Sequence, residues 1–251
     1  MEELTKPNNF IYLTLFPQLF HTYFQVSMAK EALKKGCLNH QVYNIRNWAV
    51  RGQVDDYVHG GGPGMLLKID CLVKTLAAVY ENYGKNCYVI LLSPQGKRFI
   101  QKDVKRLIQN KNLVFICGHY EGLDERILNY IDEQISVGDF VASGGETPAL
   151  LITEVLIRAL PGVLSSEVYQ NETFQTGNSF DFAAYTRPAI FEGQEVPAVL
   201  LSGNHQKIQE WRKENSRQKN QKQQQSFLNQ RKIIPQANRW RLALIKKKNK
   251  T

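Results

Sequence analysis

The sequence predicts an α/β domain built on a parallel sheet, followed by a basic C-terminal region. Short apolar segments typical of buried strands alternate with segments of helical spacing, and this alternation is typical of parallel sheets. Three of the predicted strands also end in small or glycine-bearing loops, and ligands bind beyond the carboxyl ends of strands in open parallel sheets. A hydrophobic content of 43% is sufficient for a sizeable core.

The first predicted elements are a strand, a helix and a second strand. Residues 10–16 (FIYLTLF) form an apolar run typical of a buried strand, which Pro17 ends. Residues 18–35 have helical spacing, and Gly36 ends that helix. Residues 41–46 predict the second strand.

The middle of the chain continues the alternation. A loop at residues 54–68 contains three consecutive glycines and leads into a predicted helix at 69–83. Residues 87–92 (CYVILL) predict a strand, residues 100–108 a helix and residues 113–117 (LVFIC) another buried strand.

A glycine-rich turn separates the last predicted strand from the most apolar helix. A short helix at 124–130 precedes the strand at 135–142, and Ser143-Gly144-Gly145 then interrupts the chain before a helix at 149–160. Pro148 suits a first helical turn, where its missing N–H has no partner to lose. A lone glycine pair indicates only close packing of a helix on a strand. Glycine-bearing loops after three parallel strands predict a shared ligand pocket.

Residues beyond 164 differ in composition from the preceding domain. Residues 165–184 are polar and too long for an ordinary connection, which indicates a linker or a functional loop. Residues 185–199 favour extended structure, and a helix is predicted from residue 205 to 212. We therefore expect a domain at 1–164, an interdomain loop at 165–184 and a small C-terminal region at 185–251, which includes a helical part.

The positive charge is concentrated at the C-terminal end. Residues 213–251 carry 12 Lys and Arg and one acidic residue, a net of +11 in a chain whose total is +9. The rest of the chain therefore carries a net of −2. A polyanionic partner is the first expectation, and a solvated tail is the alternative.

Several classes of protein are disfavoured. No apolar run of about 18 residues is present, so no membrane span is expected, and residues 1–10 do not resemble a secretory signal. The four cysteines are widely spaced and suit buried positions in a reducing, cytoplasmic setting. The chain has no G-x-S-x-G, Walker A, G-x-G-x-x-G or H-E-x-x-H motif. An esterase, a P-loop nucleotide-binding protein, a dinucleotide-binding fold and a zinc enzyme therefore receive no support, and we assign no metal ligands.

Five segments together resemble the bacterial tRNA (guanine-37-N1)-methyltransferases of the SPOUT, trefoil-knotted class, and they occur in that family's order. They are VDDYVHGGGPGMLLK, LLSPQGKRF, CGHYEGLDERI, ISVGDFVASGGETPALL and YTRPAIFEGQEVPAVLLSGNHQKIQEWR. The resemblance implies a parallel sheet with a deep trefoil knot and a helical C-terminal domain. It also implies S-adenosylmethionine as methyl donor, tRNA as partner, and a homodimer with its active site at the interface.

The resemblance further implies which residues form the site. The implied donor-binding residues are Leu92, Pro94, Gly96, Gly118, Tyr120, Val137, Gly138, Asp139, Phe140, Val141, Ala142, Gly144, Gly145 and Pro148. Glu121 matches the carboxylate that binds the target guanine, which offers it an N1–H and an amine. Asp181 matches the general base that removes the N1 proton. For both acids, an exposed loop residue without such a role is the alternative.

Three departures from the family pattern bear on activity. His59 stands where the family has tyrosine, and His119 replaces an arginine, which removes a permanent charge. The family's catalytic arginine in the loop after Leu164 has no counterpart before Thr186. Two alternatives stay open: an RNA-binding homologue that has lost turnover, and a SPOUT methyltransferase acting on ribosomal RNA. A requirement for a divalent metal is possible but is not indicated by any motif.

Overall fold

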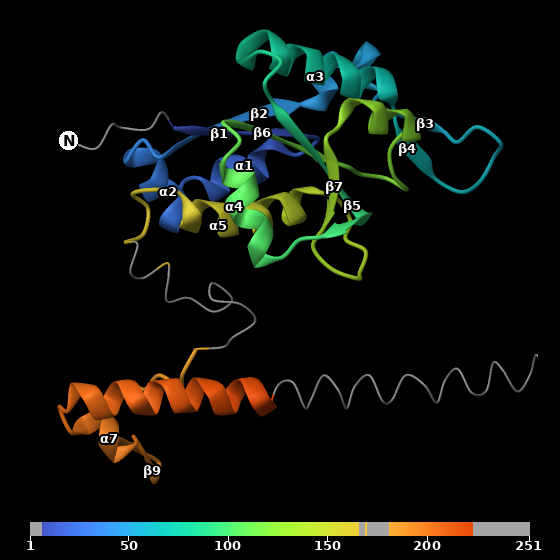
Figure 1. The fold of residues 1–251 in the computed structure, drawn as a ribbon. Coiled ribbons are helices and arrows are strands. Elements are labelled where there is room, and N and C mark those ends of the chain that lie inside the picture. Colours follow the sequence, from blue (N-terminus) through green and yellow to red (C-terminus); the bar gives the residue numbers. More distant parts are fainter. Residues whose placement is uncertain (1–6, 166–168, 170–180, 223–251) are drawn as a thin grey trace, which may run out of the picture. The chain divides into compact units, whose positions relative to one another are not determined.

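The computed structural model describes residues 7–165, 169 and 181–222 (Figure 1). The chain divides into two compact units, Met1–Tyr169 and Gln170–Thr251, and the division falls within the polar segment 165–184. In the described part of the chain, no helix has both the length and the apolar character needed to cross a membrane.

A five-stranded parallel sheet forms the centre of the first unit, with the strand order β2-β1-β6-β5-β7. Its strands are β1 (Asn8–Thr14), β2 (Leu38–Asn44), β5 (Tyr88–Arg98), β6 (Asn112–Cys117) and β7 (Glu133–Ser136). The central strands read as continuous apolar runs because both faces of the sheet are covered. The predicted α/β class and parallel sheet are therefore confirmed. The implied knot stays a prediction.

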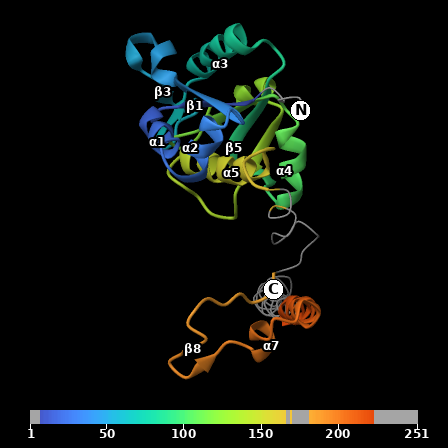
Figure 2. The same cartoon turned by 90° about the vertical axis from the view of Figure 1, so that its left-hand side faces the viewer.

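Helices cover both faces of this sheet, as Figure 2 shows. One face carries α1 (Pro17–Tyr23), α2 (Ser27–Lys34), α4 (Gln101–Ile108) and α5 (Glu146–Ala159). The other face carries α3 (Ile69–Tyr83) and the 3-10 segments η1 (Ile45–Trp48), η2 (Val50–Gly52) and η3 (Glu125–Tyr130). The alternation of strand side chains divides the core: Phe10 and Tyr12 pack on the first face, and Ile11 and Leu13 on the second.

Two predicted elements are corrected by the structure. The strand predicted at 135–142 ends at Ser136, because Gly138 and the following residues leave the sheet as a loop. The helix predicted at 18–35 is broken between α1 and α2, where Phe24 turns into the core and its ring stacks 4.0 Å from that of His40. Hydrophobic periodicity could not show this break, since both halves present apolar residues to the same face.

The glycine-rich segment predicted as a loop at 54–68 contains a small antiparallel hairpin. Its strands are β3 (Asp55–Tyr57) and β4 (Met65–Leu67). The tip between them includes glycines 60–62 and 64, all with φ between +79° and +133°. Side-chain-bearing residues adopt such angles at a cost, so the glycines are required by the shape of this tip.

The second unit is described from residue 181 to 222. Two antiparallel strands of two residues each, β8 (Ile190–Phe191) and β9 (Gln194–Glu195), form a hairpin. The short helix α7 (Ala198–Leu201) follows it. Residues 205–222 are helical, so the predicted helix is longer than expected. Asn204 begins it, accepting a hydrogen bond from the Lys207 backbone amide at 3.1 Å. The part of the expected C-terminal region from residue 223 onward lies outside the described residues.

Candidate active site

A cavity of about 550 Å³ lies at the carboxyl edge of the parallel sheet. Its walls come mainly from three loops, 93–95, 118–123 and 137–145. The implied donor-binding residues that line it are Leu92, Pro94, Gly118, Tyr120, Val137, Gly138, Phe140, Val141, Ala142, Gly144, Gly145 and Pro148. The three loops proposed from the strand pattern therefore do meet in one cavity, as expected beyond the carboxyl ends of parallel strands.

Gly96 is outside the lining of the cavity, and its role is in the backbone of β5. Leu92 and Lys97 both pair with Ile135, so the residues between them leave the sheet as an excursion (residues 93–96) that forms one wall of the cavity. A Cβ on Gly96 would lie 2.5 Å from the backbone nitrogen of Ile135. Only glycine allows the excursion to return this close to β7.

Asp139 is also outside the lining. Its carboxylate is ion-paired with Arg98, and the Asp139 side chain is 86% exposed. Arg98 ends β5 and Asp139 lies in the loop after β7, so the pair links these two segments outside the lining of the cavity. The geometry therefore places Asp139 beside the site without bringing it to the inner surface.

The two glycines between β7 and α5 allow close packing and also help to shape the cavity. The Gly145 amide donates to the Gly118 carbonyl at 2.8 Å, and a Cβ on Gly145 would lie 2.7 Å from Cys117 Cα. A Cβ on Gly144 would overlap the His119 ring. Gly145 thus brings α5 against the end of β6, and Gly144 leaves room for His119 at the cavity wall.

A buried carboxylate that sequence reasoning missed lies directly behind this wall. Glu146 is 3% exposed; its Oε1 accepts a hydrogen bond from Thr14 Oγ1 at 2.6 Å, and its Oε2 lies 2.9 Å from His119 Nε2. The His119 ring packs on Phe16 with 4.8 Å between ring centroids. The available signal was an acidic residue at the start of a mostly apolar helix. Histidine here takes a defined partner, where the sequence indicated only a lost charge.

Glu121 lies at the cavity wall and is held by the β3–β4 hairpin. The Glu121 amide donates to the Met65 carbonyl at 3.1 Å, and the Leu67 amide donates to the Gly122 carbonyl at 3.0 Å. The Glu121 side chain lies so close to Gly64 that any Cβ there would overlap it. Tyr120, with φ of 64°, turns the chain between His119 and Glu121. The triple-glycine segment therefore belongs to the site because it supports Glu121.

Asp181 is described only within the second unit, so the structure does not relate it to Glu121. Asp181 is exposed, and its backbone carbonyl accepts a hydrogen bond from Lys219 Nζ at 3.1 Å. Much of the segment between Leu164 and Asp181 lies outside the described residues. Within the described part of the chain, no three His, Cys, Asp or Glu side chains are grouped so as to hold a metal ion.

The fold and this cavity define an α/β protein that binds a ligand at the carboxyl edge of a parallel sheet. The profile of the tRNA (guanine-1)-methyltransferase TrmD family matches residues 9–230, so the chain belongs to that family. The tRNA (guanine-N(1)-)-methyltransferase of Metamycoplasma arthritidis is 45% identical over 228 residues, which are 90% of this chain and 98% of the relative.

Two further comparisons agree with this assignment. The tRNA (guanine-N(1)-)-methyltransferase of Carboxydothermus hydrogenoformans is 44% identical over 207 residues, 81% of each protein. The crystal structure of the tRNA (m1G37) methyltransferase from Aquifex aeolicus matches with a TM-score of 0.71 and 40% sequence identity, over 82% of this chain and 87% of that one. The predicted family and enzyme class are confirmed, and proteins of this family use S-adenosylmethionine as methyl donor.

Proposed function

We propose that this protein transfers a methyl group from S-adenosylmethionine to N1 of guanosine 37 in tRNA, and that the donor binds in the cavity at the carboxyl edge of the sheet. One observation carries the proposal: three loops from separate strands enclose a single cavity, and every implied donor-binding residue except Gly96 and Asp139 lines it.

The lining of the cavity suits S-adenosylmethionine. Leu92, Val137 and Phe140 offer apolar surface for an adenine ring, and Gly118 and Gly144 leave backbone groups accessible for polar contacts. Its volume, about 550 Å³, lies within the ordinary range for small-molecule sites, roughly 300–1,000 Å³. The residues present therefore fit the donor.

When bound, S-adenosylmethionine supplies a methyl group on a sulfonium centre, whose C–S bond breaks as the bond to guanine N1 forms. Guanine N1 carries a proton at neutral pH, so that proton must leave during the transfer. Glu121, at the cavity wall, accepts a hydrogen bond from the exocyclic amine of guanine, which adenine lacks at that position, and leaves the N1–H to the base. Asp181 is the proposed base that takes the proton.

We also infer that the enzyme acts as a homodimer, with the site completed by a second copy. Asp181 and Glu121 belong to different units of the chain. The second unit exposes large apolar side chains, which need a covering surface in water. Those residues are Tyr185, Ile190, Phe191 and Leu201, exposed by 49%, 60%, 64% and 61%. A partner subunit bringing its Asp181 to the cavity would satisfy both observations.

A second candidate function is RNA binding without turnover, which the absence of any arginine between Leu164 and Thr186 favours. Two measurements separate the candidates. Calorimetry tests whether the donor binds, and incubation with unmodified tRNA followed by mapping of the modified nucleotide tests transfer. Donor binding without N1-methylguanosine at position 37 would favour the binding protein. Absence of donor binding would overturn the assignment of the cavity.

A further inference from the structure

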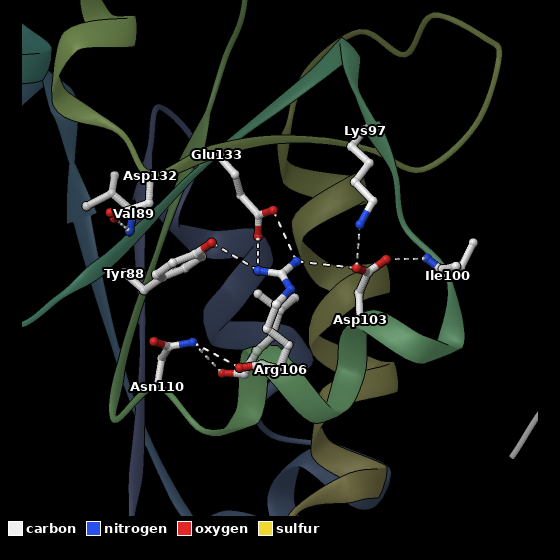
Figure 3. Close-up of polar contacts among 10 residues, drawn as sticks. Tyr88, Val89, Lys97, Ile100, Asp103, Arg106, Asn110, Asp132 and Glu133 are labelled. Atoms are coloured by element: carbon white, nitrogen blue, oxygen red, sulfur yellow. Dashed lines mark hydrogen bonds and ion pairs between the residues drawn. The ribbon is translucent and has the colours of Figure 1, made fainter.

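Arg106 of α4 lies at the centre of a polar network that joins α4 to β5 and β7 (Figure 3). Its guanidinium donates to both carboxylate oxygens of Glu133, Nη1 to Oε1 at 3.0 Å and Nη2 to Oε2 at 3.1 Å. Nη1 also donates to the Tyr88 hydroxyl at 2.9 Å, and Nη2 to Asp103 Oδ1 at 3.3 Å. Paired hydrogen bonds of this type fix geometry as well as charge.

Asp103 extends the network from α4 to the far end of β5. Its side chain is 8% exposed, and it accepts hydrogen bonds from Lys97 Nζ at 3.0 Å and from the Ile100 amide at 3.1 Å. Burial alone would raise the pKa of Asp103, but the hydrogen bonds from Lys97, Ile100 and Arg106 outweigh it and lower that pKa. The carboxylate is therefore held in its charged form between two cations.

The network joins both ends of β5 to the start of β7. Arg106 contacts Tyr88 and Glu133, the first residues of the two strands, and Asp103 contacts Lys97, where β5 rejoins the sheet. Lys97 is the first residue after the 93–96 excursion, and its partner in the sheet is Ile135. Glu133 lies two residues before Ile135 on β7. None of Lys97, Asp103, Arg106 and Glu133 lines the cavity. Any influence of these side chains on a ligand must pass through the backbone of the excursion and of β7.

We propose that Arg106 and Asp103 are positioning residues for the methyl donor, which fix β5 and β7 so that residues 93–95 and 137–142 keep their places as cavity walls. The inference rests on the proposed donor site. Sites that depend on loop geometry require a rigid supporting shell. A bidentate, half-buried guanidinium provides this better than an exposed ion pair would.

The test is the affinity of the folded enzyme for S-adenosylmethionine, by calorimetry, together with KM for donor and for tRNA. In Arg106→Met, the Kd and KM for the donor should rise about tenfold or more, because displacing binding groups by about 1 Å weakens their contacts by at least that factor. The KM for tRNA should change less than about twofold. Arg106→Lys keeps the charge without the paired geometry and should show most of the loss.

Asn112→Ala is the matched control. Asn112 is 8% exposed and donates to the Tyr83 and Asn86 carbonyls at 3.4 and 3.0 Å, at the amino end of β6 away from the cavity. This change should lower Tm without altering donor Kd.

If folded Arg106→Met loses stability as Asn112→Ala does but binds donor as tightly as wild type, the network only supports the fold and the inference is overturned. Should Arg106→Met fail to fold, Glu133→Gln, which keeps size and one acceptor, gives the same test. Failure of the wild type to bind donor would instead overturn the proposed function.

Discussion

His119 Nε2 lies 2.9 Å from Glu146 Oε2, and this contact joins the loop after β6 to the start of α5. Thr14, the last residue of β1, donates to the other carboxylate oxygen of Glu146 at 2.6 Å. One buried carboxylate therefore connects three segments that follow or precede the cavity loops. Because a buried carboxylate needs its partners, the arrangement fixes the direction of the His119 side chain at the cavity wall.

Removing this carboxylate should destabilise the fold. Glu146→Ala leaves Thr14 and His119 without their partner, so the free energy of unfolding should fall by about 1–3 kcal/mol. Denaturant titration measures the change. Glu31→Ala is the control, because the Glu31–Lys34 pair is exposed and such pairs contribute about 0–1 kcal/mol. An equal loss of unfolding free energy in the two variants would show that the buried contact stabilises the fold no more than an exposed ion pair does.

A branched side chain at Gly144 should abolish donor binding. Gly144 lines the cavity, and a Cβ there would overlap the His119 ring and lie 2.6 Å from Glu146 Oε2. Valine would fill that space and push His119 into the cavity, whereas Gly144→Ala should weaken binding less. Calorimetry with S-adenosylmethionine measures both. Undiminished affinity in folded Gly144→Val protein would exclude this part of the cavity as the donor site.

Replacing the proposed base should affect turnover more than binding. Asp181→Asn preserves size and removes basicity, so methyl transfer to tRNA should fall by about 10²-fold or more. Donor and tRNA affinities should change little, because the base acts as the transition state forms. Single-turnover assays and calorimetry measure the two quantities. A turnover close to wild type would show that Asp181 is one of the exposed loop acids.

Mixed dimers test whether the site is shared between subunits. Asp181→Asn and Gly144→Val homodimers should both be nearly inactive. In a mixed dimer, one site combines an intact cavity from one subunit with an intact Asp181 from the other, so activity should return to a fraction of wild type after subunit exchange. No recovery in verified heterodimers would assign cavity and base to the same subunit, or the base to another residue.

The C-terminal charge should contribute to tRNA affinity. Residues 223–251, outside the described part of the chain, carry eight Lys and Arg and no acidic residue. Truncation after residue 222 keeps the described helix and should weaken tRNA binding. It should also flatten the salt dependence of binding, by roughly 0.9 unit of slope for each phosphate that the tail no longer neutralises. Donor affinity should remain unchanged. An unaltered salt slope would identify the tail as a solvated appendage.

The lowered pKa of Asp103 predicts a pH dependence of stability. Because its pKa is lower in the folded state than in the unfolded one, its contribution is present above the unfolded value, about 3.9, and is lost as pH falls through the folded value. Unfolding free energies measured from pH 6 to pH 2 should therefore decline less steeply in Asp103→Asn than in the wild type. Parallel profiles for the two proteins would show that protonation of Asp103 does not change the stability of the fold.

Sequence alone was sufficient for the parallel sheet, the class of enzyme and the three loops of the cavity. Buried parallel strands require unbroken apolar runs such as residues 113–117, and sharp loops require glycines, so both are visible in local composition. The motif order then indicated the family, and with it residues such as Glu121. These features depend on residues that are close together in the sequence, so local sequence patterns are enough to predict them.

The tertiary structure decided which polar side chains support those loops. Glu146 meets Thr14, 132 residues away, and Arg106 meets Glu133, 27 residues away. Leu92 and Lys97 of β5 both pair with Ile135 of β7, so residues 93–96 between them have no partner in β7 and form the excursion. Each of these relationships depends on strand register and on the packing of α4 and α5 against the sheet. Register and packing are set by long-range contacts, so no local pattern could have indicated them.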